Sequence, residues 1–360
     1  MNREKDIECL KRAQKVEDHM SFKYRLEQAT PDFFAGGTNR TATRRNISDL
    51  RDIAMYSMRI EPGGLRELHW HPNAGELNYC LQGQGTIGIL TPEGEADFFP
   101  IHPGSVSFIP TGSAHFIFNG SQETLHLITV FSSAEPEHID ISSTLGNISR
   151  TLWAQTFNIP NVWFPDLPQQ GDQFLVKSAQ ALNNNTLWGT KTSSSSPFTF
   201  NMNMITPHIY AGGTAHELTT SQIPSLDGLT LFLLAAYSEA LREPHWHPNT
   251  GELDYCVSGT AQMEILGPNG QRESFVIEPG DIAYIPQNFL HYIDNASNDP
   301  FQFLVFFSNS APTNIDFSQV FTSFSHELLA ASFGPDLSIF NKVPKPGNVF
   351  LAAKRQQADV

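Results

Sequence analysis

The sequence predicts an all-β protein made of two closed antiparallel barrels or jelly rolls, with small helical additions. Three observations predict this fold class. Short runs rich in Val, Ile, Phe and Tyr alternate with turns that contain Gly, Pro and Asn, which is typical of many short antiparallel strands. The chain repeats itself with a constant shift of 176 positions. At 360 residues it is long enough for two domains, each with its own core.

The repeat extends far beyond one motif. The segment LRELHWHPNAGEL at 65–77 returns as LREPHWHPNTGEL at 241–253, and AGGT at 35–38 returns at 211–214. The register holds without a gap from about residue 21 to about residue 142. A period this long indicates duplication of a whole domain, because solenoid repeats span only about 20–50 residues.

The duplication divides the chain into five predicted parts. Within each copy, strand-like runs such as TIGIL (86–90) and FQFLVFF (301–307) come before a segment with a helical pattern, at 142–157 and at 318–333. A polar, Ser-rich stretch separates the copies. The predicted parts are an N-terminal helical extension (1–20), a first domain (21–157), a linker (158–196), a second domain (197–335) and a C-terminal tail (336–360).

Composition and charge exclude several kinds of partner. The formal net charge is −15, because 37 acidic residues outnumber 22 basic ones, and such a chain repels nucleic acid and anionic membranes. No run approaches the roughly 18 apolar residues of a membrane span. The first twenty residues are charged and lack the apolar segment of a secretory signal. We therefore expect a cytoplasmic protein that binds neither nucleic acid nor membrane.

Each copy carries a set of residues that can hold a metal ion. His69 and His71 project to the same side of a strand, because side chains two residues apart share a face. Glu76 follows after a turn-forming stretch, and His115 comes about forty residues later. Three imidazoles and one carboxylate inside a barrel suit a divalent transition metal and leave coordination positions open. The second copy repeats the set as His245, His247, Glu252 and His291.

These residues lie in motifs that resemble those of the cupin superfamily. The first copy matches the first motif with Gly63, His69, His71, Glu76 and Gly83, and the second motif with Gly104, Pro110, Gly112, His115 and Asn119. The second copy departs at two turn positions, where Glu239 and Asn288 replace glycines. The resemblance covers most of the chain and implies a bicupin.

A closer resemblance is to the bicupin oxalate decarboxylases, which share the wording RExHWHPN. It implies one Mn²⁺ per domain, use of dioxygen, and cleavage of oxalate to formate and carbon dioxide. The ligands alone also suit iron, zinc, nickel or copper. Bicupins of this type often assemble as trimers or as dimers of trimers, so we expect a homo-oligomer.

Two arginines are predicted to bind the substrate. Arg66 and Arg242 each precede the first ligand histidine by three residues, which places them out of phase with the ligands in a regular strand. A guanidinium can give oxalate two charge-assisted hydrogen bonds beside the metal. The alternative is a structural ion pair with Glu67 or Glu243.

The loop after the last strand differs between the copies. It reads FSSAEPEHID in the first copy and FSNSAPTNID in the second, so Glu135 and Glu137 have no acidic counterparts. In the decarboxylases a loop at this place carries a glutamate that handles the proton, and formate production needs a positioned acid. We therefore predict that these glutamates, with Arg66, make the N-terminal site the catalytic one.

Two other functions remain open. The first is an oxalate oxidase, which would use the same ligands and dioxygen and would release hydrogen peroxide; the wording ELNYCLQG is as similar to germin-like proteins as to the decarboxylases. The second is a non-catalytic bicupin that binds or stores metal. Complete ligand sets in both copies argue against this second alternative.

Overall fold

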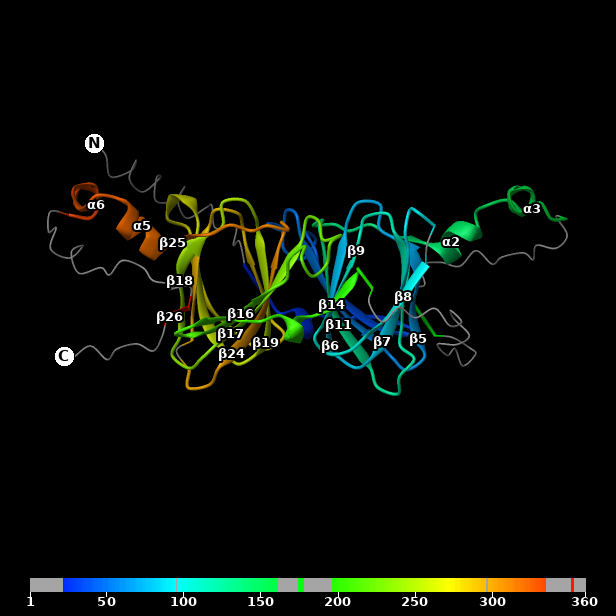
Figure 1. The fold of residues 1–360 in the computed structure, drawn as a ribbon, viewed down its shortest axis with the longest axis horizontal. Helices are drawn as coiled ribbons and strands as arrows, with labels where there is room; N and C mark the ends of the chain where they lie inside the picture. Colours follow the sequence, from blue (N-terminus) through cyan, green and yellow to red (C-terminus); the bar gives the residue numbers. More distant parts are fainter. Residues whose placement is uncertain are drawn as a thin grey trace, which may run out of the picture.

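The computed structural model of the chain describes residues 22–94, 96–160, 174–177, 196–295, 297–334 and 351–352. The predicted helix at 1–20 lies outside these residues, as do most of the linker (158–196) and most of the tail (336–360). The described residues form two β-barrels side by side, with short helices at the two outer ends (Figure 1). The predicted all-β, two-barrel fold class is confirmed.

The first barrel consists of two antiparallel sheets that face each other. One has seven strands in the order β14-β9-β6-β11-β4-β3-β2, and the other has the order β12-β5-β10-β7-β8 with β13 also paired to β5. The strands are β2 (Asp32–Phe34), β3 (Gly37–Ala42), β4 (Ala54–Ile60), β5 (Gly64–Trp70), β6 (Glu76–Gln82), β7 (Gly85–Leu90), β8 (Ala96–Ile101), β9 (Ser105–Ile109), β10 (Ala114–Phe118), β11 (Leu125–Phe131), β12 (Ile139–Asp140), β13 (Leu175–Lys177) and β14 (Thr199–Asn201).

The second barrel repeats this plan. Its sheets have the orders β1-β22-β19-β24-β17-β16-β15 and β21-β20-β23-β18-β25, and β26 also pairs with β18. The strands are β1 (Lys23–Tyr24), β15 (His208–Tyr210), β16 (Gly213–Glu217), β17 (Thr230–Ala236), β18 (Leu241–Trp246), β19 (Glu252–Ser258), β20 (Ala261–Leu266), β21 (Arg272–Ile277), β22 (Ile282–Ile285), β23 (Leu290–Asp294), β24 (Phe301–Phe307), β25 (Ile315–Asp316) and β26 (Leu351–Ala352).

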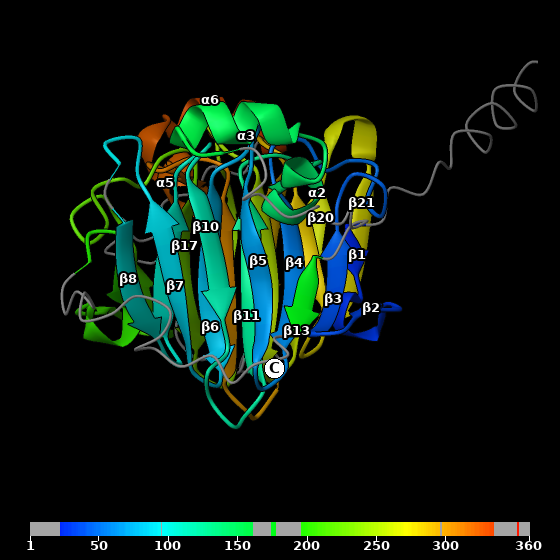
Figure 2. The same cartoon turned by 90° about the vertical axis from the view of Figure 1, so that its right-hand side faces the viewer.

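The two copies exchange their first strands. Strand β1 pairs with β22 of the second barrel, where Lys23 lies opposite Ala283. Strand β14, at the equivalent place in the second copy, pairs with β9 of the first barrel, where Thr199 lies opposite Ser107. Figure 2 shows β1 beside the strands of the second copy. This exchange ties the two barrels together through the backbone.

Alternation along the strands separates two kinds of core. On β4, Met55 points outward into a core shared with the second barrel, whereas Met58 points into the first barrel. The shared core also contains Leu231 and Leu304 of the second barrel. Period-two alternation therefore gives each seven-stranded sheet one face for the interface and one face for the interior, where the metal ligands lie.

The predicted helical segments are confirmed as two short helix pairs. These are α2 (Ile141–Leu145) and α3 (Arg150–Phe157) after the first copy, and α5 (Phe317–Ser323) and α6 (His326–Phe333) after the second; the 3-10 helices are η1 (Leu26–Gln28), η3 (Met202–Met204) and η4 (Pro268–Gly270). Ser149 and Ser325 cap α3 and α6 through their side chains. None of the described helices has the length and apolar character needed to cross a membrane.

Candidate metal centres

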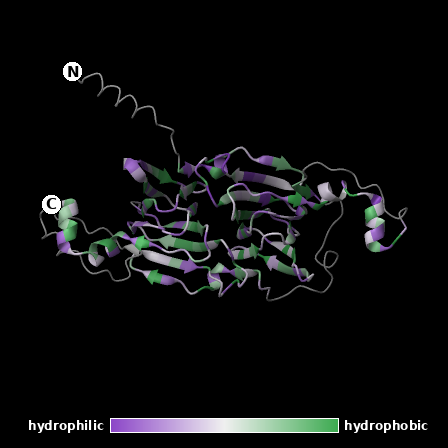
Figure 3. Cartoon of the chain, turned by 90° about the horizontal axis from the view of Figure 1, so that it is seen from above, coloured by the Kyte–Doolittle hydropathy of each residue, from purple (hydrophilic) through white to green (hydrophobic). Residues whose placement is uncertain are grey.

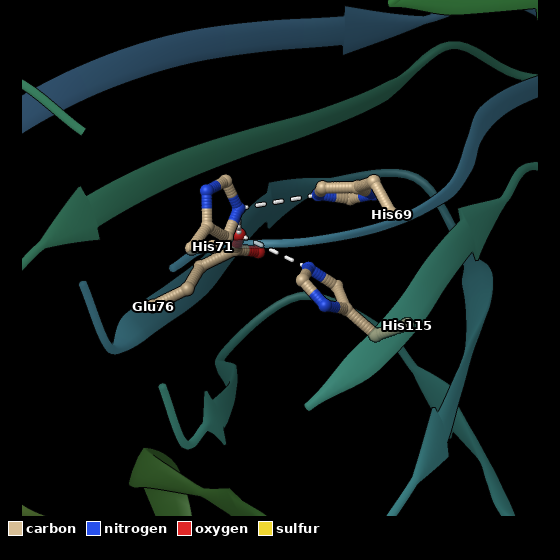
Figure 4. A group of neighbouring side chains, drawn as sticks. All are labelled: His69, His71, Glu76 and His115. Carbon is tan, nitrogen blue, oxygen red and sulfur yellow. Dashed lines mark hydrogen bonds and ion pairs between the residues drawn. The ribbon is translucent and has the colours of Figure 1, made fainter. Parts of the chain in front are cut away.

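Four side chains from both sheets of the first barrel converge on one point (Figure 4). His69 lies near the end of β5, His71 directly follows that strand, Glu76 opens β6 and His115 lies on β10. The Nε2 atom of His71 is 2.8 Å from Oε2 of Glu76 and 3.2 Å from Nε2 of His69, and Nε2 of His115 is 3.2 Å from the same Glu76 oxygen. All four side chains are buried.

The second barrel holds the same arrangement. His245, His247, Glu252 and His291 are buried, and their ligand atoms lie within 4.8 Å of one another, as they do in the first barrel. Oε2 of Glu252 is 2.8 Å from Nε2 of His247 and 3.2 Å from Nε2 of His291. These three atoms are close but not aligned as hydrogen bonds, so within the described part of the chain they are buried polar atoms without a hydrogen-bond partner. The predicted ligand sets are therefore assembled in both barrels.

The histidine tautomers fit metal binding. In the first barrel, each imidazole directs Nδ1 at a backbone carbonyl: His69 at Glu67, His71 at Glu137 and His115 at Ser113, over 2.7–2.9 Å. Such a bond places the ring hydrogen on Nδ1 and leaves the Nε2 lone pair for a metal. Two ligand atoms that each lie about 2.1 Å from the same metal ion are about 3 Å from each other. The separations of the ligand atoms in these sites agree with this value. The residues present therefore fit a divalent metal.

The electrostatics of the first set favour the same protonation states. Burial lowers the pKa of His69 well below its ordinary value, and the nearby positive charge of Arg66 lowers it further. Burial alone would raise the pKa of Glu76, but His115 and His71 together outweigh it and lower that pKa well below its ordinary value. A neutral imidazole and an ionised carboxylate are the forms that bind metals.

Comparison with known proteins agrees with this geometry. A sequence model of the family described as Cupin matches residues 25–161 and 200–338, one match for each barrel. The chain belongs to the cupin family. It is a bicupin with two three-histidine, one-glutamate metal-binding sites.

The relatives of this bicupin include oxalate decarboxylases. Oxalate decarboxylase OxdC of Bacillus subtilis is 26% identical over 289 residues, which cover 79% of this chain and 74% of the relative. An oxalate decarboxylase of Arthroderma benhamiae is 24% identical over 354 residues, which cover 90% and 83%. The Rhicadhesin receptor of Pisum sativum is 32% identical over 131 residues, or 32% of this chain and 60% of the relative.

A solved structure of the Bacillus subtilis oxalate decarboxylase, a protein with Mn(II) centres, superposes with a TM-score of 0.82. The sequences are 22% identical, and the match covers 93% of this chain and 89% of the other. At this identity the likeness establishes the bicupin fold.

A β-bulge changes the orientation expected for the arginines of the bicupin. His115 lies opposite His69, but Ile117 lies opposite Arg66, so β5 advances three residues while β10 advances two. The extra residue brings Arg66 onto the side of the ligands. The pairing of β18 with β23 has the same shift, between Arg242 and His245. The expectation that the arginines are out of phase with the ligands is therefore wrong.

Arg66 is held by an aspartate and an aromatic ring. Its Nη1 atom donates to Oδ1 of Asp140 over 2.8 Å and to the carbonyl oxygen of Phe174 over 3.1 Å, and its guanidinium carbon lies 4.1 Å from the centre of the Phe174 ring. Its Nη2 atom is buried and has no hydrogen-bond partner among the described residues. Glu67, the alternative partner considered from the sequence, instead accepts from the backbone and hydroxyl of Ser142. The ion pair exists, but its partner is Asp140.

The loop that follows β11 contacts the metal site through its backbone. The backbone carbonyl of Glu137 accepts a hydrogen bond from His71. The side-chain amide of Asn73 donates to the carbonyl of Glu135 over 3.0 Å and accepts from the backbone amide of Glu137 over 2.9 Å. The side chains of Glu135 and Glu137 are exposed. The catalytic role expected for these two glutamates therefore stays a prediction.

The residue behind the ligand glutamate differs between the barrels. In the first barrel the amide of Asn78 donates to Oε1 of Glu76 over 2.7 Å, and Thr129 donates to Asn78. In the second barrel Asp254 stands at this place, and neither of its buried oxygens has an aligned hydrogen-bond partner among the described residues. Burial, followed by the charge of Glu252, raises the pKa of Asp254 well above its ordinary value.

A small pocket adjoins the metal ligands of the second barrel. Arg242, His245, His247 and Glu252 lie on its polar side. The other lining residues are mostly apolar: Phe232, Leu234, Ile293, Val305, Phe307 and Pro312, with Thr313 and Asn314 from the loop after β24.

Sequence reasoning missed several residues of these sites. Asp140 and Asp316, the partners of the arginines, end the repeated loop segments FSSAEPEHID and FSNSAPTNID, but the sequence did not identify them as partners. Phe174 lies in the predicted linker, and no local signal marked it.

Proposed function

We propose that this bicupin is a manganese-dependent oxalate decarboxylase that cleaves oxalate to formate and carbon dioxide. The observation that carries the proposal is the arginine beside the metal ligands, whose buried Nη2 atom in the first barrel has no hydrogen-bond partner among the described residues. The similarity to oxalate decarboxylases over most of the chain supports the choice of substrate. Bound Mn²⁺ would supply a positive anchor for oxalate oxygens and a redox-active centre for dioxygen.

The protein's part in this reaction is to bind and orient oxalate and to move a proton. Asp140 and Phe174 hold the Arg66 guanidinium by one edge, and the other edge can donate to a carboxylate. When the carbon–carbon bond breaks, one half leaves as carbon dioxide and the electron pair stays on the other carbon. That carbon takes one proton to become formate, and Glu135 or Glu137 would deliver it after a movement of the loop.

Oxalate oxidation is the second candidate, and the exposed positions of Glu135 and Glu137 favour it. In that reaction oxalate gives two electrons to dioxygen, and two protons complete hydrogen peroxide, while both carbons leave as carbon dioxide. No proton is needed at carbon, so the reaction does not require the loop acids.

One assay separates the two reactions. Manganese-loaded protein is incubated with oxalate at acidic pH in air, and formate and hydrogen peroxide are measured in the same sample. A formate yield close to the oxalate consumed supports the decarboxylase. Peroxide without formate supports the oxidase, and the absence of both products from metal-loaded protein contradicts this proposal.

We further propose that the chain forms a homo-oligomer through its helical ends. Leu152 and Phe157 on α3 are 56% and 58% exposed, and Leu328 and Phe333 on α6 are 53% and 64% exposed. Seen from above, both outer ends carry hydrophobic segments (Figure 3). Exposed apolar clusters of this kind are typical of subunit contacts. Light scattering of the purified protein tests this, and a monomer at micromolar concentration would contradict it.

A further inference from the structure

The two metal sites differ in one wall residue that can make a hydrogen bond. Phe232 on β17 lines the pocket of the second barrel together with Arg242 and the metal ligands. Tyr56 on β4 occupies the equivalent position in the first barrel. The exchange therefore adds one hydroxyl group to the first site.

The rings at these two positions have nearly the same geometry. The ring centre of Tyr56 lies 4.8 Å from that of Phe131, which lies 4.9 Å from the ring of the ligand His71. In the second barrel, Phe232 lies 5.0 Å from Phe307, which lies 5.0 Å from His247. Because the ring distances match in the two barrels, we infer that Tyr56 faces the first metal site as Phe232 faces the second.

Tyr56 also lies close to the substrate-binding arginine. Its ring centre is 6.5 Å from that of Phe174, the ring on which the Arg66 guanidinium rests. Phe131, Tyr56 and Phe174 thus form an aromatic arc from the ligand His71 to Arg66. Tyr56 therefore lies between the ligand His71 and the arginine that is proposed to bind the substrate.

The Tyr56 hydroxyl makes no hydrogen bond with any described residue, although the residue is only partly exposed. Burial raises the pKa of Tyr56 to about 12, so the hydroxyl keeps its proton and acts as a donor. Thr129, another hydroxyl in this barrel, already donates to Asn78. The loop position is polar in both copies, where His138 and Asn314 each face an aspartate, so it does not distinguish the sites.

The side chains that surround each metal site determine whether it can hold a monocarboxylic or a dicarboxylic acid. One carboxylate can be satisfied by the metal and the arginine in either barrel. In the second barrel a second carboxylate would lie against Phe232, Leu234 and the other apolar residues of the pocket wall. None of these side chains can donate a hydrogen bond to it, so its binding there is disfavoured. In the first barrel the Tyr56 hydroxyl can donate to that second carboxylate.

We propose that Tyr56 is a specificity-determining residue: its hydroxyl donates a hydrogen bond to the second carboxylate of a small diacid, and Phe232 leaves the C-terminal site selective for a small monocarboxylate. This inference rests on the proposed function only in taking a carboxylate as the ligand.

The test measures binding instead of turnover. Glu252→Ala isolates the N-terminal site and Glu76→Ala isolates the C-terminal site, and the manganese content of each protein is measured first. Oxalate and propionate are then titrated calorimetrically under nitrogen, where no reaction with dioxygen consumes the oxalate. In the N-terminal protein, Tyr56→Phe is expected to weaken oxalate binding by about 10- to 100-fold, the usual value of a hydrogen bond to a charged group. Propionate binding should stay within about twofold.

The reciprocal variant tests the same idea in the other barrel. Phe232→Tyr in the C-terminal protein is expected to strengthen oxalate binding and leave propionate binding unchanged. Equal loss of both ligands in Tyr56→Phe, or unchanged oxalate binding with full manganese, would overturn the inference, as would a parent protein that binds no oxalate. A parent that binds oxalate through Tyr56 but forms neither formate nor peroxide would contradict the proposed function and leave the inference standing.

Discussion

Arg66 and Asp140 form a buried ion pair, with 2.8 Å between Nη1 and Oδ1, although 74 residues separate them in the chain. Both side chains are at most 4% exposed. The aspartate lies on β12, directly opposite His69 of β5, so the pair is built into the sheet that carries the ligands. Asp140 thereby neutralises the charge of Arg66. It also fixes the orientation of the guanidinium, including the edge with the Nη2 atom.

Replacement of Asp140 should therefore impair both stability and turnover. Asp140→Asn leaves the buried Arg66 without its counter-charge, and breaking such a pair costs about 3–5 kcal/mol. We expect a lower melting temperature, unchanged manganese per chain, and a raised KM for oxalate. Asp316→Asn is the matched variant, because Asp316 holds Arg242 in the same way; it should lose similar stability but little turnover. Equal loss of turnover in both variants would argue against a catalytic N-terminal site.

The ligands and the duplication were predictable from the sequence because both are local or repeated patterns. His69 and His71 share a face by strand periodicity alone, and the second copy repeats the pair as His245 and His247. Tertiary relationships were not predictable in this way. The bulge that turns Arg66 inward depends on pairing with β10, and the exchange of β1 depends on contacts with a barrel that begins almost two hundred residues later. A partner 74 residues away, such as Asp140, leaves no periodic signal.

Arg66→Lys should keep the metal and lose most turnover. A lysine ammonium is a point charge and cannot reproduce the planar fork that donates to Asp140, to the carbonyl of Phe174 and to a carboxylate at once. Steady-state formate production and elemental analysis of the same sample check this. Arg242→Lys is the control and should retain most activity. Normal turnover of Arg66→Lys would exclude the proposed role of Arg66 in binding oxalate.

Glu27 should make stability depend on pH. Burial alone would raise its pKa, but hydrogen bonds from His126 and Ser57 and the charge of Arg59 outweigh this and lower the pKa to about 2. A lowered pKa stabilises the fold fully above the ordinary value of 4.5, and this stabilisation is lost as the pH falls toward about 2. Glu27→Gln should thus cost about 1–2 kcal/mol at pH 7 and almost nothing near pH 2.

The measurement is urea unfolding of parent and variant across this pH window. Glu93→Gln, a change at an exposed turn residue, is the control and should shift nothing. A difference between parent and Glu27→Gln that does not shrink toward pH 2 would refute the charge-based explanation.

Asp254→Asn should stabilise the metal-free second barrel. The raised pKa of Asp254 means that the folded chain keeps a proton which the unfolded chain releases above about pH 4, so stability falls as the pH rises above that value. An asparagine removes this loss and can donate to Glu252, as Asn78 donates to Glu76. Thermal unfolding of the metal-free protein at pH 7 should show a gain of about 1–3 kcal/mol. Asn78→Asp, the reverse exchange, should destabilise; a gain in that variant would contradict this account.

The N-terminal site should carry the chemistry, and its loop should supply the proton. Both barrels hold complete ligand sets and a buried arginine, so binding of metal alone does not distinguish them. Glu135 and Glu137 have Ala311 and Thr313 at the equivalent positions, so the first loop alone offers carboxylates there. Asn73 fixes the loop backbone beside His71, so the two glutamates belong to the loop next to the first metal site.

Loss of a general acid typically lowers a rate by about 10²- to 10⁴-fold. The double variant Glu135→Gln, Glu137→Gln should therefore form little formate, and hydrogen peroxide should rise because oxidation needs no proton at carbon. Manganese content and oxalate affinity should not change, because both residues are exposed and neither is a metal ligand. Glu252→Ala is the control: it should empty the C-terminal site and leave most formate production. A normal rate in the loop variant, together with a dead Glu252→Ala protein, would move the chemistry to the second barrel and reduce the loop glutamates to solvated surface charges.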